Sequence, residues 1–468
     1  MGHVIDKLGP LLGFMVPAVL LLGIVIFVHE VGHFLAAKAV GVTVLRFSLG
    51  FGPRLVGFQA GTTEYRLSWI PLGGYVQMAG DAPGEDGHMP EGPDQYLSHP
   101  WPGRMLIAIA GPLANLITAF VVLTLVGLTG ETYPNDPNVL GAVPDTSVAY
   151  HSGFREGDRI VALNDHAIHS WIEIFLVNEN LDRKQPARVG IRRGADSLEV
   201  SLSADQREPL FSSLKPPADP PIVARVHVGM PAYKAGLQVG DRVRAVDGDS
   251  VATWDEMRAH IVDKADRPLR LTVERAGQVF DLTVVPINST GDKGGAGQIG
   301  IERQTHAVYT GRYPLGTSLK NAGLGTLDMV GSVYHGMWLT ISRPLYYREY
   351  LGGPLFIAQE ASEEAQHGTD SFLRFLALIN IAVMAFNLLP VPVLDGGHML
   401  LGVIEAVTRR RISVRLYLNF QRVGLVVLGT LFLLIFTNDP WRIIQRRLAI
   451  GREPHSTSTE RPVAPAPP

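Results

Sequence analysis

Four apolar runs constrain the fold of this chain more than any other feature of its sequence. A transmembrane helix needs about 20 predominantly apolar residues, and four stretches are candidates, of which the first two exceed this length and the last is short. They are Leu12–Ala37, Met105–Leu128, Phe372–Leu389 and Val423–Phe436. At 46% hydrophobic and 18% charged residues, the chain is also too polar for a bare helical bundle. We therefore predict a polytopic α-helical membrane protein with about four transmembrane helices and sizeable soluble parts.

Charge and cysteine content exclude several classes of protein. The formal net charge of −3 gives no basic field of the kind that attracts nucleic acid, so we expect no nucleic-acid partner. The chain has 0 cysteines, which excludes disulfides, thiolate metal ligands and cysteine nucleophiles. Any zinc site must therefore be built from histidine and carboxylate side chains.

A His-Glu-x-x-His motif ends the first apolar run. His29 and His33 are four residues apart, so they share one helix face and can bind one Zn²⁺ through neutral imidazole nitrogens. Glu30 lies close enough to act as general base on an attacking water. Polar groups at the edge of a bilayer are costly unless something pairs with them. The apolar setting therefore favours a zinc site over a surface helix that carries this motif by chance.

Topology brings a second polar motif to the same depth. The first and third spans cross the membrane in the same direction, so their ends meet at one face. Asp395 follows the third run, in the sequence Leu-Asp-Gly-Gly. Because catalytic zinc keeps three protein ligands and a water, we predict Asp395 as the third ligand. An ordinary turn or helix cap would use the same residues.

Two further polar residues flank this motif. His398 is an alternative ligand, although a hydrogen bond to a ligand or a purely structural role is the simpler assignment. Asn387 lies in an apolar stretch about two helical turns before Asp395, and its amide needs a partner there. It either holds the backbone of a substrate or bonds a neighbouring helix.

The segment between the second and third runs contains an internal repeat. Residues of the first copy recur in the second at a constant offset of 83 positions, which indicates duplication. The matched residues are Gly153, Gly157, Asp158, Arg159, Ala162 and Trp171 with Gly236, Gly240, Asp241, Arg242, Ala245 and Trp254. The pattern resembles PDZ domains, which bind extended peptides by adding a strand to a sheet edge.

The repeat either binds peptides or serves as a spacer. The ligand loop expected in the second copy, Pro220–Ala224, lacks the small-apolar-Gly pattern that the first retains as Leu140-Gly141-Ala142. Elsewhere, Phe47–Met78 alternates apolar and polar residues and predicts two or three β-strands, either membrane-associated or in an ordinary hairpin. Leu315–Gln366 has amphipathic character and suits a segment that lies on the membrane.

Together these motifs resemble the site-2 protease family of intramembrane zinc metalloproteases. The resemblance extends from about Leu11 to Phe436 and includes a G-x-x-x-N motif in the second span, Gly111 to Asn115. It implies that His29, His33 and Asp395 bind one Zn²⁺ per chain. It also implies that Glu30 is the catalytic glutamate, that Asn387 binds substrate, and that a membrane-associated β-sheet lies beside the active site.

The resemblance further implies a zinc metalloendopeptidase of the bacterial inner membrane, with periplasmic PDZ domains. Its expected partners are the lipid bilayer and a single-span membrane protein already cut by another protease. Such substrates include an anti-sigma factor in envelope stress signalling and signal-peptide remnants. The competing hypotheses are a membrane-tethered PDZ scaffold with an inactive metal site, and a transporter. A transporter predicts paired repeats of membrane segments, whereas repetition here is confined to the insert.

These interpretations divide the chain into nine parts. They are 1–40, the first transmembrane helix with the His-Glu motif; 41–104, a β-sheet and loop; 105–130, the second transmembrane helix; 131–213 and 214–305, two tandem PDZ domains; 306–371, an amphipathic connecting segment; 372–400, the third transmembrane helix and the Leu-Asp-Gly motif; 401–436, a loop and the fourth transmembrane helix; and 437–468, a tail whose end we expect to be disordered.

Overall fold

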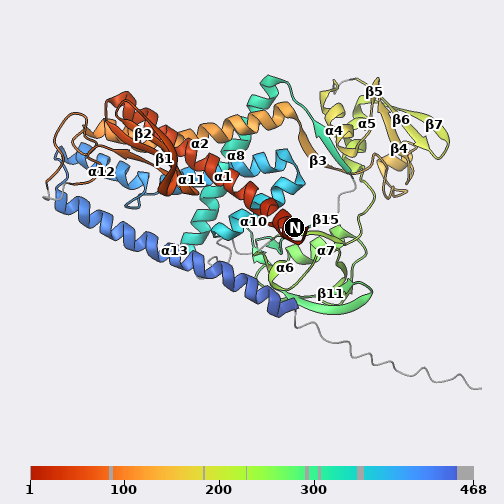
Figure 1. The fold of residues 1–468 in the computed structure, drawn as a ribbon. Coiled ribbons are helices and arrows are strands. Elements are labelled where there is room, and N and C mark those ends of the chain that lie inside the picture. The colour runs from red at the N-terminus through yellow and green to blue at the C-terminus, as the bar shows by residue number, and fades with distance from the viewer. Residues whose placement is uncertain are drawn as a thin grey trace, which may run out of the picture. The chain divides into compact units, whose positions relative to one another are not determined.

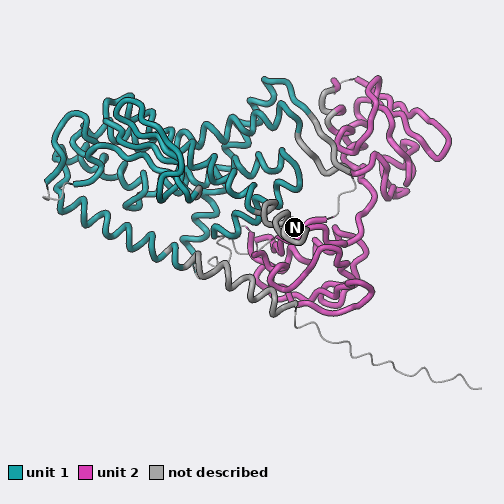
Figure 2. Tube along the Cα trace, viewed as in Figure 1, with its two compact units in different colours: residues 1–132, 310–439 teal, residues 133–309, 440–468 magenta. Residues whose placement is uncertain are grey.

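The computed structural model describes residues 2–83, 88–182, 185–227, 229–289, 295–303, 307–344 and 353–450. The chain forms two compact units, which Figure 2 distinguishes by colour. The first comprises Met1–Thr132 and Thr310–Asp439, and the second comprises Tyr133–Tyr309 and Pro440–Pro468. The end of the predicted tail, from residue 451 on, lies outside the described residues.

Helices dominate the first unit. They are α1 (Gly2–Val40), α2 (Trp101–Thr129), α8 (Leu315–Ser342), α10 (Pro354–His367), α11 (Thr369–Asn387), α12 (Asp395–Thr408) and α13 (Val414–Ile450), which continues past the boundary of the unit (Figure 1). One apolar core joins α1, α2, α10 and α11 through residues such as Leu21, Ala119, Ala361 and Ile381, all within 0–3% exposure. The site described below lies among these packed helices.

Three of the described helices are long and apolar enough to cross a membrane. They are Met15–Val40, Trp101–Thr129 and Thr369–Asn387, and their bounds lie within four residues of the first three predicted spans. Helix α2 also exposes a stripe of large apolar side chains at helical spacing, while Asn115 on its other face is fully buried. An apolar exterior around buried polar groups is the arrangement that a lipid environment favours. The chain is therefore a membrane protein with a β region.

The fourth predicted span lies within α13. This helix is not among the three described helices that meet the conditions for a span. Its apolar run is short and is bounded by Arg422 and Asp439, so the number of spans remains a prediction. Residues 437–450, which we had assigned to the tail, continue this helix. The predicted loop after the third span begins at residue 401. Its first part, residues 401–408, is helical, because α12 extends to Thr408.

A bent hairpin follows α1. Its strands are β1 (Val44–Ala60) and β2 (Thr63–Met78), joined by a turn in which Gly61 has a φ of 59°. Residues 46–49 pair both with 64–67 and with 74–77, so the two strands fold into four segments in the order 54–60, 63–68, 44–51 and 70–78. Segment 70–78 forms one edge, with no further strand beside it among the described residues. The sequence predicted two or three strands here. The structure has two long strands, and each is bent so that it forms two of the four paired segments.

The second unit contains the two copies of the repeat. The first copy comprises α3 (Val148–His151), β4 (Arg159–Leu163), β5 (His166–Ala167), α4 (Trp171–Asn180), β6 (Ala187–Arg193), β7 (Asp196–Leu202) and α5 (Ala204–Ser213). The second comprises β8 (Val223–Val226), α6 (Pro231–Lys234), β9 (Arg242–Val246), β10 (Asp249–Ser250), α7 (Trp254–Val262), β11 (Leu269–Arg275), β12 (Gln278–Val284), β13 (Ile287–Asn288), β14 (Gly297–Gln298) and β15 (Ile301–Arg303). The remaining pair, β3 (Glu131–Asn135) and β16 (Ala307–Gly311), lies where the chain passes between the units.

Both copies fold in the same way. Their four-stranded sheets have the orders β5-β4-β6-β7 and β10-β9-β11-β12. The first four matched elements, α3 to α4 and α6 to α7, begin 83 residues apart, which is the offset found in the sequence. Each copy also has its own apolar core, around Phe154 in the first and Leu237 in the second. The sequence repeat is therefore a repeat of structure.

A buried ion pair explains the Gly-Asp step of each copy. Asp158 and Asp241 are 0% exposed, and each receives two hydrogen bonds of 2.7–2.8 Å from one arginine, Arg193 or Arg275. The same guanidinium groups donate to the carbonyl oxygens of Gly153 and Gly236. The pairing raises the pKa of Arg193. A buried carboxylate of this kind needs its full set of partners, so both copies retain the pair.

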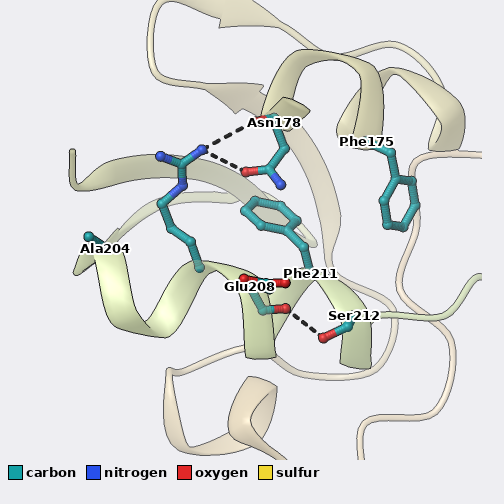
Figure 3. Close-up of a pocket in the computed structure, with 7 residues that line it drawn as sticks. Phe175, Asn178, Ala204, Glu208, Phe211 and Ser212 are labelled. Carbon is teal, nitrogen blue, oxygen red and sulfur yellow. Dashed lines mark hydrogen bonds between the residues drawn. The ribbon is translucent and has the colours of Figure 1, made fainter. Parts of the chain in front are cut away.

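The copies differ beside their second helix. In the first, α5 lies next to α4, and Arg207 donates to the backbone and side-chain oxygens of Asn178 (Figure 3). A cavity of about 360 Å³ between these helices is lined mainly by α5. In the second copy, a cavity of about 300 Å³ beside α7 is lined instead by the extended residues 296–301.

This difference changes the expectation for the ligand loops. In the first copy, the backbone N–H of Gly141 donates to the carbonyl of Lys215, so the predicted loop is covered by the chain itself. In the second copy, the predicted loop Pro220–Ala224 leads into β8, which pairs with β15. The segment that borders α7 is 296–301, which contains β14 and the first residue of β15. Sequence spacing could not reveal this, because that segment follows the matched part of the repeat.

Candidate metal centre

Three predicted ligands from two distant parts of the chain meet in the first unit. The Nε2 atoms of His29 and His33 lie 3.1 Å apart. The carboxylate oxygens of Asp395 lie 3.2 Å from His29 Nε2 and 3.3 Å from His33 Nε2. Of the residues that the structure describes, these three form the group able to hold a metal ion.

The spacing of these atoms matches a tetrahedral ion. Bonds of about 2.0–2.1 Å to zinc place tetrahedral ligand atoms about 3.3–3.4 Å apart. The N–N distance of 3.1 Å and the shortest N–O distance from each imidazole, 3.2 Å to Oδ2 and 3.3 Å to Oδ1, are close to this value. Asp395 Oδ2 is buried and has no hydrogen-bond partner of good geometry. Such an orphaned oxygen is costly in an apolar setting unless it binds a cation. The donor set and its geometry therefore fit a zinc ion.

Helix α2 holds His29 and His33 in place. His33 Nδ1 lies 2.8 Å from the carbonyl oxygen of Ile107, so Nδ1 carries the proton and Nε2 keeps its lone pair. His29 Nδ1 lies 3.3 Å from the side-chain amide of Asn115. Both imidazoles are therefore anchored at the ring nitrogen that faces away from Asp395.

Gly111 provides the space for these rings. A Cβ atom at this position would lie 2.3 Å from His33 Nε2 and 2.9 Å from His29 Cε1. Any larger residue would have to displace an imidazole. The G-x-x-x-N motif thus places Gly111, which has no side chain, against both rings. One helical turn later, it places the side-chain amide of Asn115 against His29.

The break between α11 and α12 positions Asp395. Pro390 and Pro392 lack a backbone N–H, so the helix cannot continue through them. Val393 adopts a φ of 79°, which is rare for a β-branched residue and marks a constrained turn. Asp395 then begins α12. A Cβ at Gly396 would lie 2.2 Å from the carbonyl oxygen of Leu389, so only glycine allows the turn to pack this closely.

Glu30 and Asn387 line the same cavity. Its volume is about 520 Å³, and it also contains the three metal-binding candidates. The side chain of Glu30 lies against β2, because a Cβ atom at Gly74 would come within 3.3 Å of Glu30 Cγ. Tyr75, Val76 and Met78 of that strand border the cavity, so the free edge of the hairpin lies beside the candidate metal centre. The structure thus brings all five predicted site residues together.

Three ring side chains also line the cavity. His398 is not among the converging donors, and it packs against Tyr96 and Tyr417 with ring-centroid distances of 6.0 and 6.4 Å. Burial lowers the pKa of His398 and raises the pKa of Tyr96. All three rings are therefore neutral near pH 7. The position of His398 agrees with a structural role better than with a ligand role.

Sequence reasoning missed two features of the site. It noted Gly111 and Asn115 only as a motif of the second span and did not predict their contacts with the imidazoles. It also did not identify the carbonyl of Ile107 as the partner of His33. The contact of Asn115 had a usable signal in the sequence, because Asn115 is a polar residue one turn after a glycine in an apolar span. The carbonyl of Ile107 had none, because every residue has a backbone carbonyl.

The fold and the site define a class of protein: a multi-helix membrane protein in whose helical unit the two histidines of a His-Glu-x-x-His motif converge with an aspartate as third candidate ligand. The model for peptidase family M50 matches residues 17–431. The chain belongs to this family and is a metalloprotease of the site-2 type.

Similar proteins support the same assignment. The chain is 31% identical to Protease RseP of Yersinia pestis, over 89% of this chain and 96% of the relative. It is 30% identical to the regulator of sigma-E protease RseP of Escherichia coli K12, over 89% of this chain and 96% of the relative. A regulator of sigma-E protease from Salmonella typhimurium is 31% identical, with 90% and 97% covered. The predicted family is thereby confirmed.

Proposed function

We propose that this chain is an intramembrane zinc protease in which His29, His33 and Asp395 bind one Zn²⁺ per chain. One observation carries the proposal: the two Nε2 atoms lie 3.1 Å apart, and a different carboxylate oxygen of Asp395 lies 3.2–3.3 Å from each of them. Two neutral imidazoles and one carboxylate are a donor set that suits catalytic zinc and leaves a fourth position open. The charges of Asp395 and Glu30 together balance that of the ion.

Glu30 is the general base in this proposal. Zinc, when bound, supplies a Lewis acid that polarises the scissile carbonyl and acidifies water. Glu30 takes a proton from the attacking water as its oxygen bonds to the carbonyl carbon. It then returns the proton to the leaving amine as the C–N bond breaks. Packing against β2 restrains the side chain of Glu30 at the cavity wall.

The substrate is an extended segment of a transmembrane helix. A peptide bond within a helix must be unwound before it can reach the metal, and an unwound strand needs partners for its backbone. The free edge of β2 offers such partners next to Glu30. Asn387, at the end of α11 and on the cavity wall, holds the opened strand.

The remaining partners follow from the family. We propose a single-span membrane protein as substrate, such as an anti-sigma factor or a signal-peptide remnant, in a bacterial inner membrane. We also propose that the two copies of the repeat are periplasmic PDZ domains. Of these, the second is the better candidate for peptide binding, because extended backbone borders α7 there while α5 lines the matching space in the first.

Metal removal tests the proposed function. The full-length chain, purified in detergent with a single-span substrate, should contain one zinc per chain and cleave the substrate within its apolar segment. Dialysis against a chelator should abolish cleavage, and one equivalent of zinc should restore it. Cleavage that persists in zinc-free protein would contradict the proposal, as would full activity at a zinc content far below one per chain.

Asn115 is a positioning residue in this proposal. Its Oδ1 is buried without a partner, and half a turn of the amide places that oxygen where it accepts a hydrogen bond from His29 Nδ1. His29 Nε2 then keeps the lone pair that zinc requires. We expect Asn115→Leu to lower zinc affinity by about 10–100-fold.

Two variants separate this role from general packing. Asn115→Asp keeps an acceptor and should retain most of the zinc affinity. Asn380→Leu removes another fully buried asparagine in a membrane span, one that donates to Leu376, and should leave zinc affinity unchanged. Competition with a zinc-binding dye measures all three. Equal losses in the Asn115→Leu and Asn380→Leu proteins would remove Asn115 from its assigned role.

A further inference from the structure

A second cavity lies at the opposite end of α12 from Asp395. Its volume is about 350 Å³, and it is bordered by the first turn of α2 and the last turn of α12. The residues Arg409, Arg410 and Arg411, which follow α12, form one side, and Trp101 and Arg104 of α2 form the other. No residue of this cavity belongs to the candidate metal centre.

The cavity carries a strong positive charge. Four arginines line it against one carboxylate, that of Glu405, which gives a net charge of +3. Glu405 is already committed, because it pairs with Arg104 and accepts a hydrogen bond of 2.9 Å from the backbone of Ile412. Among the described residues, Arg409, Arg410 and Arg411 have no ion-pair partner. The three exposed guanidinium groups therefore lack a counter-ion from the chain itself.

The base of the cavity is fixed. Arg104 and Glu405 are 13% and 9% exposed, so their ion pair ties α2 to α12 away from water. The Nε of Arg104 is buried and has no hydrogen-bond partner. The bond from Ile412 to Glu405 holds the loop of three arginines against this base. The arrangement differs from a mobile basic tail because the charges surround a defined volume.

The position of the cavity selects a lipid as its ligand. It lies at the first turn of a helix that is long and apolar enough to cross a membrane. Trp101, which is 40% exposed, starts that helix, and Leu106 and Ile109 continue an exposed apolar stripe from it. Tryptophan at a helix end marks the headgroup level of a bilayer. An occupant here can have its anionic group among the arginines and its acyl chains along α2.

We propose that this cavity binds the headgroup of an anionic phospholipid. Arginine forms paired hydrogen bonds with phosphate oxygens, and basic pockets between membrane helices bind such headgroups. The site would hold a lipid at the junction of α2 and α12, the two helices that also contribute Gly111 and Asp395 to the metal centre. This binding site is independent of the proposed protease chemistry.

Native mass spectrometry of the full-length chain in detergent tests the proposal. Dioleoyl phosphatidylglycerol is the probe, and dioleoyl phosphatidylcholine is the zwitterionic comparison. We expect saturable retention of the phosphatidylglycerol and no matching retention of the phosphatidylcholine. Arg410→Gln/Arg411→Gln should weaken binding of the anionic lipid by at least about tenfold. Both residues are exposed, so the fold should be kept.

A matched control removes the same charge outside the cavity. Arg415→Gln/Arg422→Gln changes two exposed arginines of α13 that do not line it, and should leave lipid binding unchanged. Equal losses in both double variants would overturn the proposal, because general attraction to the membrane surface would then explain the binding. Complete displacement of the lipid by millimolar inorganic phosphate would also overturn it in favour of a free-phosphate site. If the double variant is unstable, Arg410→Gln and Arg411→Gln are measured singly, and each should weaken binding.

Discussion

Glu30→Gln is expected to lower the rate of substrate cleavage by at least about 10²-fold while leaving one zinc bound per chain. The amide has nearly the same shape as the carboxylate, so it fills the space beside Val76 without disturbing the imidazoles. It cannot accept a proton from water near neutral pH. The loss should therefore appear in the rate of the chemical step, measured with the purified chain and a single-span substrate under single-turnover conditions.

The matched control for this variant is Glu91→Gln. Glu91 is an exposed glutamate of the same unit that does not line the cavity, so its replacement should change neither zinc content nor rate. Cleavage by the Glu30→Gln protein at the wild-type rate would remove Glu30 from its role as general base. Loss of zinc from that protein would instead show that Glu30 contributes to metal binding.

Asp395→Asn is expected to have the opposite signature, with both zinc and activity lost. The substitution removes the only charged member of the donor set and leaves a divalent cation among two neutral imidazoles in an apolar setting. Its effect on zinc affinity should exceed the 10–100-fold expected for a residue that only orients a ligand. Zinc content after dialysis and equilibrium competition with a chelating dye both measure it.

Asp81→Asn is the control for Asp395. Asp81 lines the same cavity, and burial raises the pKa of its carboxyl, yet it is not among the three converging donors. Its variant should keep zinc at the wild-type level. A full complement of zinc in the Asp395→Asn protein would show that another residue completes the site, and His398 would then be the first to test by substitution.

The positions of the first three spans were predictable because they depend on local composition. An apolar run of sufficient length has one stable arrangement in lipid, that of a helix with its backbone hydrogen bonds made internally. The same locality explains why the repeat could be located by its offset. Two features were not predicted: the bend in the hairpin and the helical form of residues 401–408. Both depend on contacts with distant segments, which local composition does not show.

The candidate site likewise has features that the sequence predicts and features that only the structure gives. Spacing placed His29 and His33 on one helix face, and span parity brought Asp395 to their depth, so the sequence could nominate the donors. It could not give the separations of 3.1–3.3 Å between the imidazoles and the carboxylate, which depend on the turn at Val393 and on the close approach at Gly111. The contact of Asn115 with His29 likewise exists only once α1 and α2 are packed.

The sequence by itself determined which chemical groups this protein has and which stretches are apolar enough to cross a membrane, because hydrophobic length and helical periodicity act within a few turns of chain. Only the tertiary structure decided how those groups meet. Packing of α1, α2 and α12 sets the donor distances, and the fold of the hairpin brings a free strand edge to Glu30. The loop after α12 encloses a basic cavity instead of a diffuse patch. Each of these depends on residues far apart in sequence, whose separations follow from packing and not from local pattern.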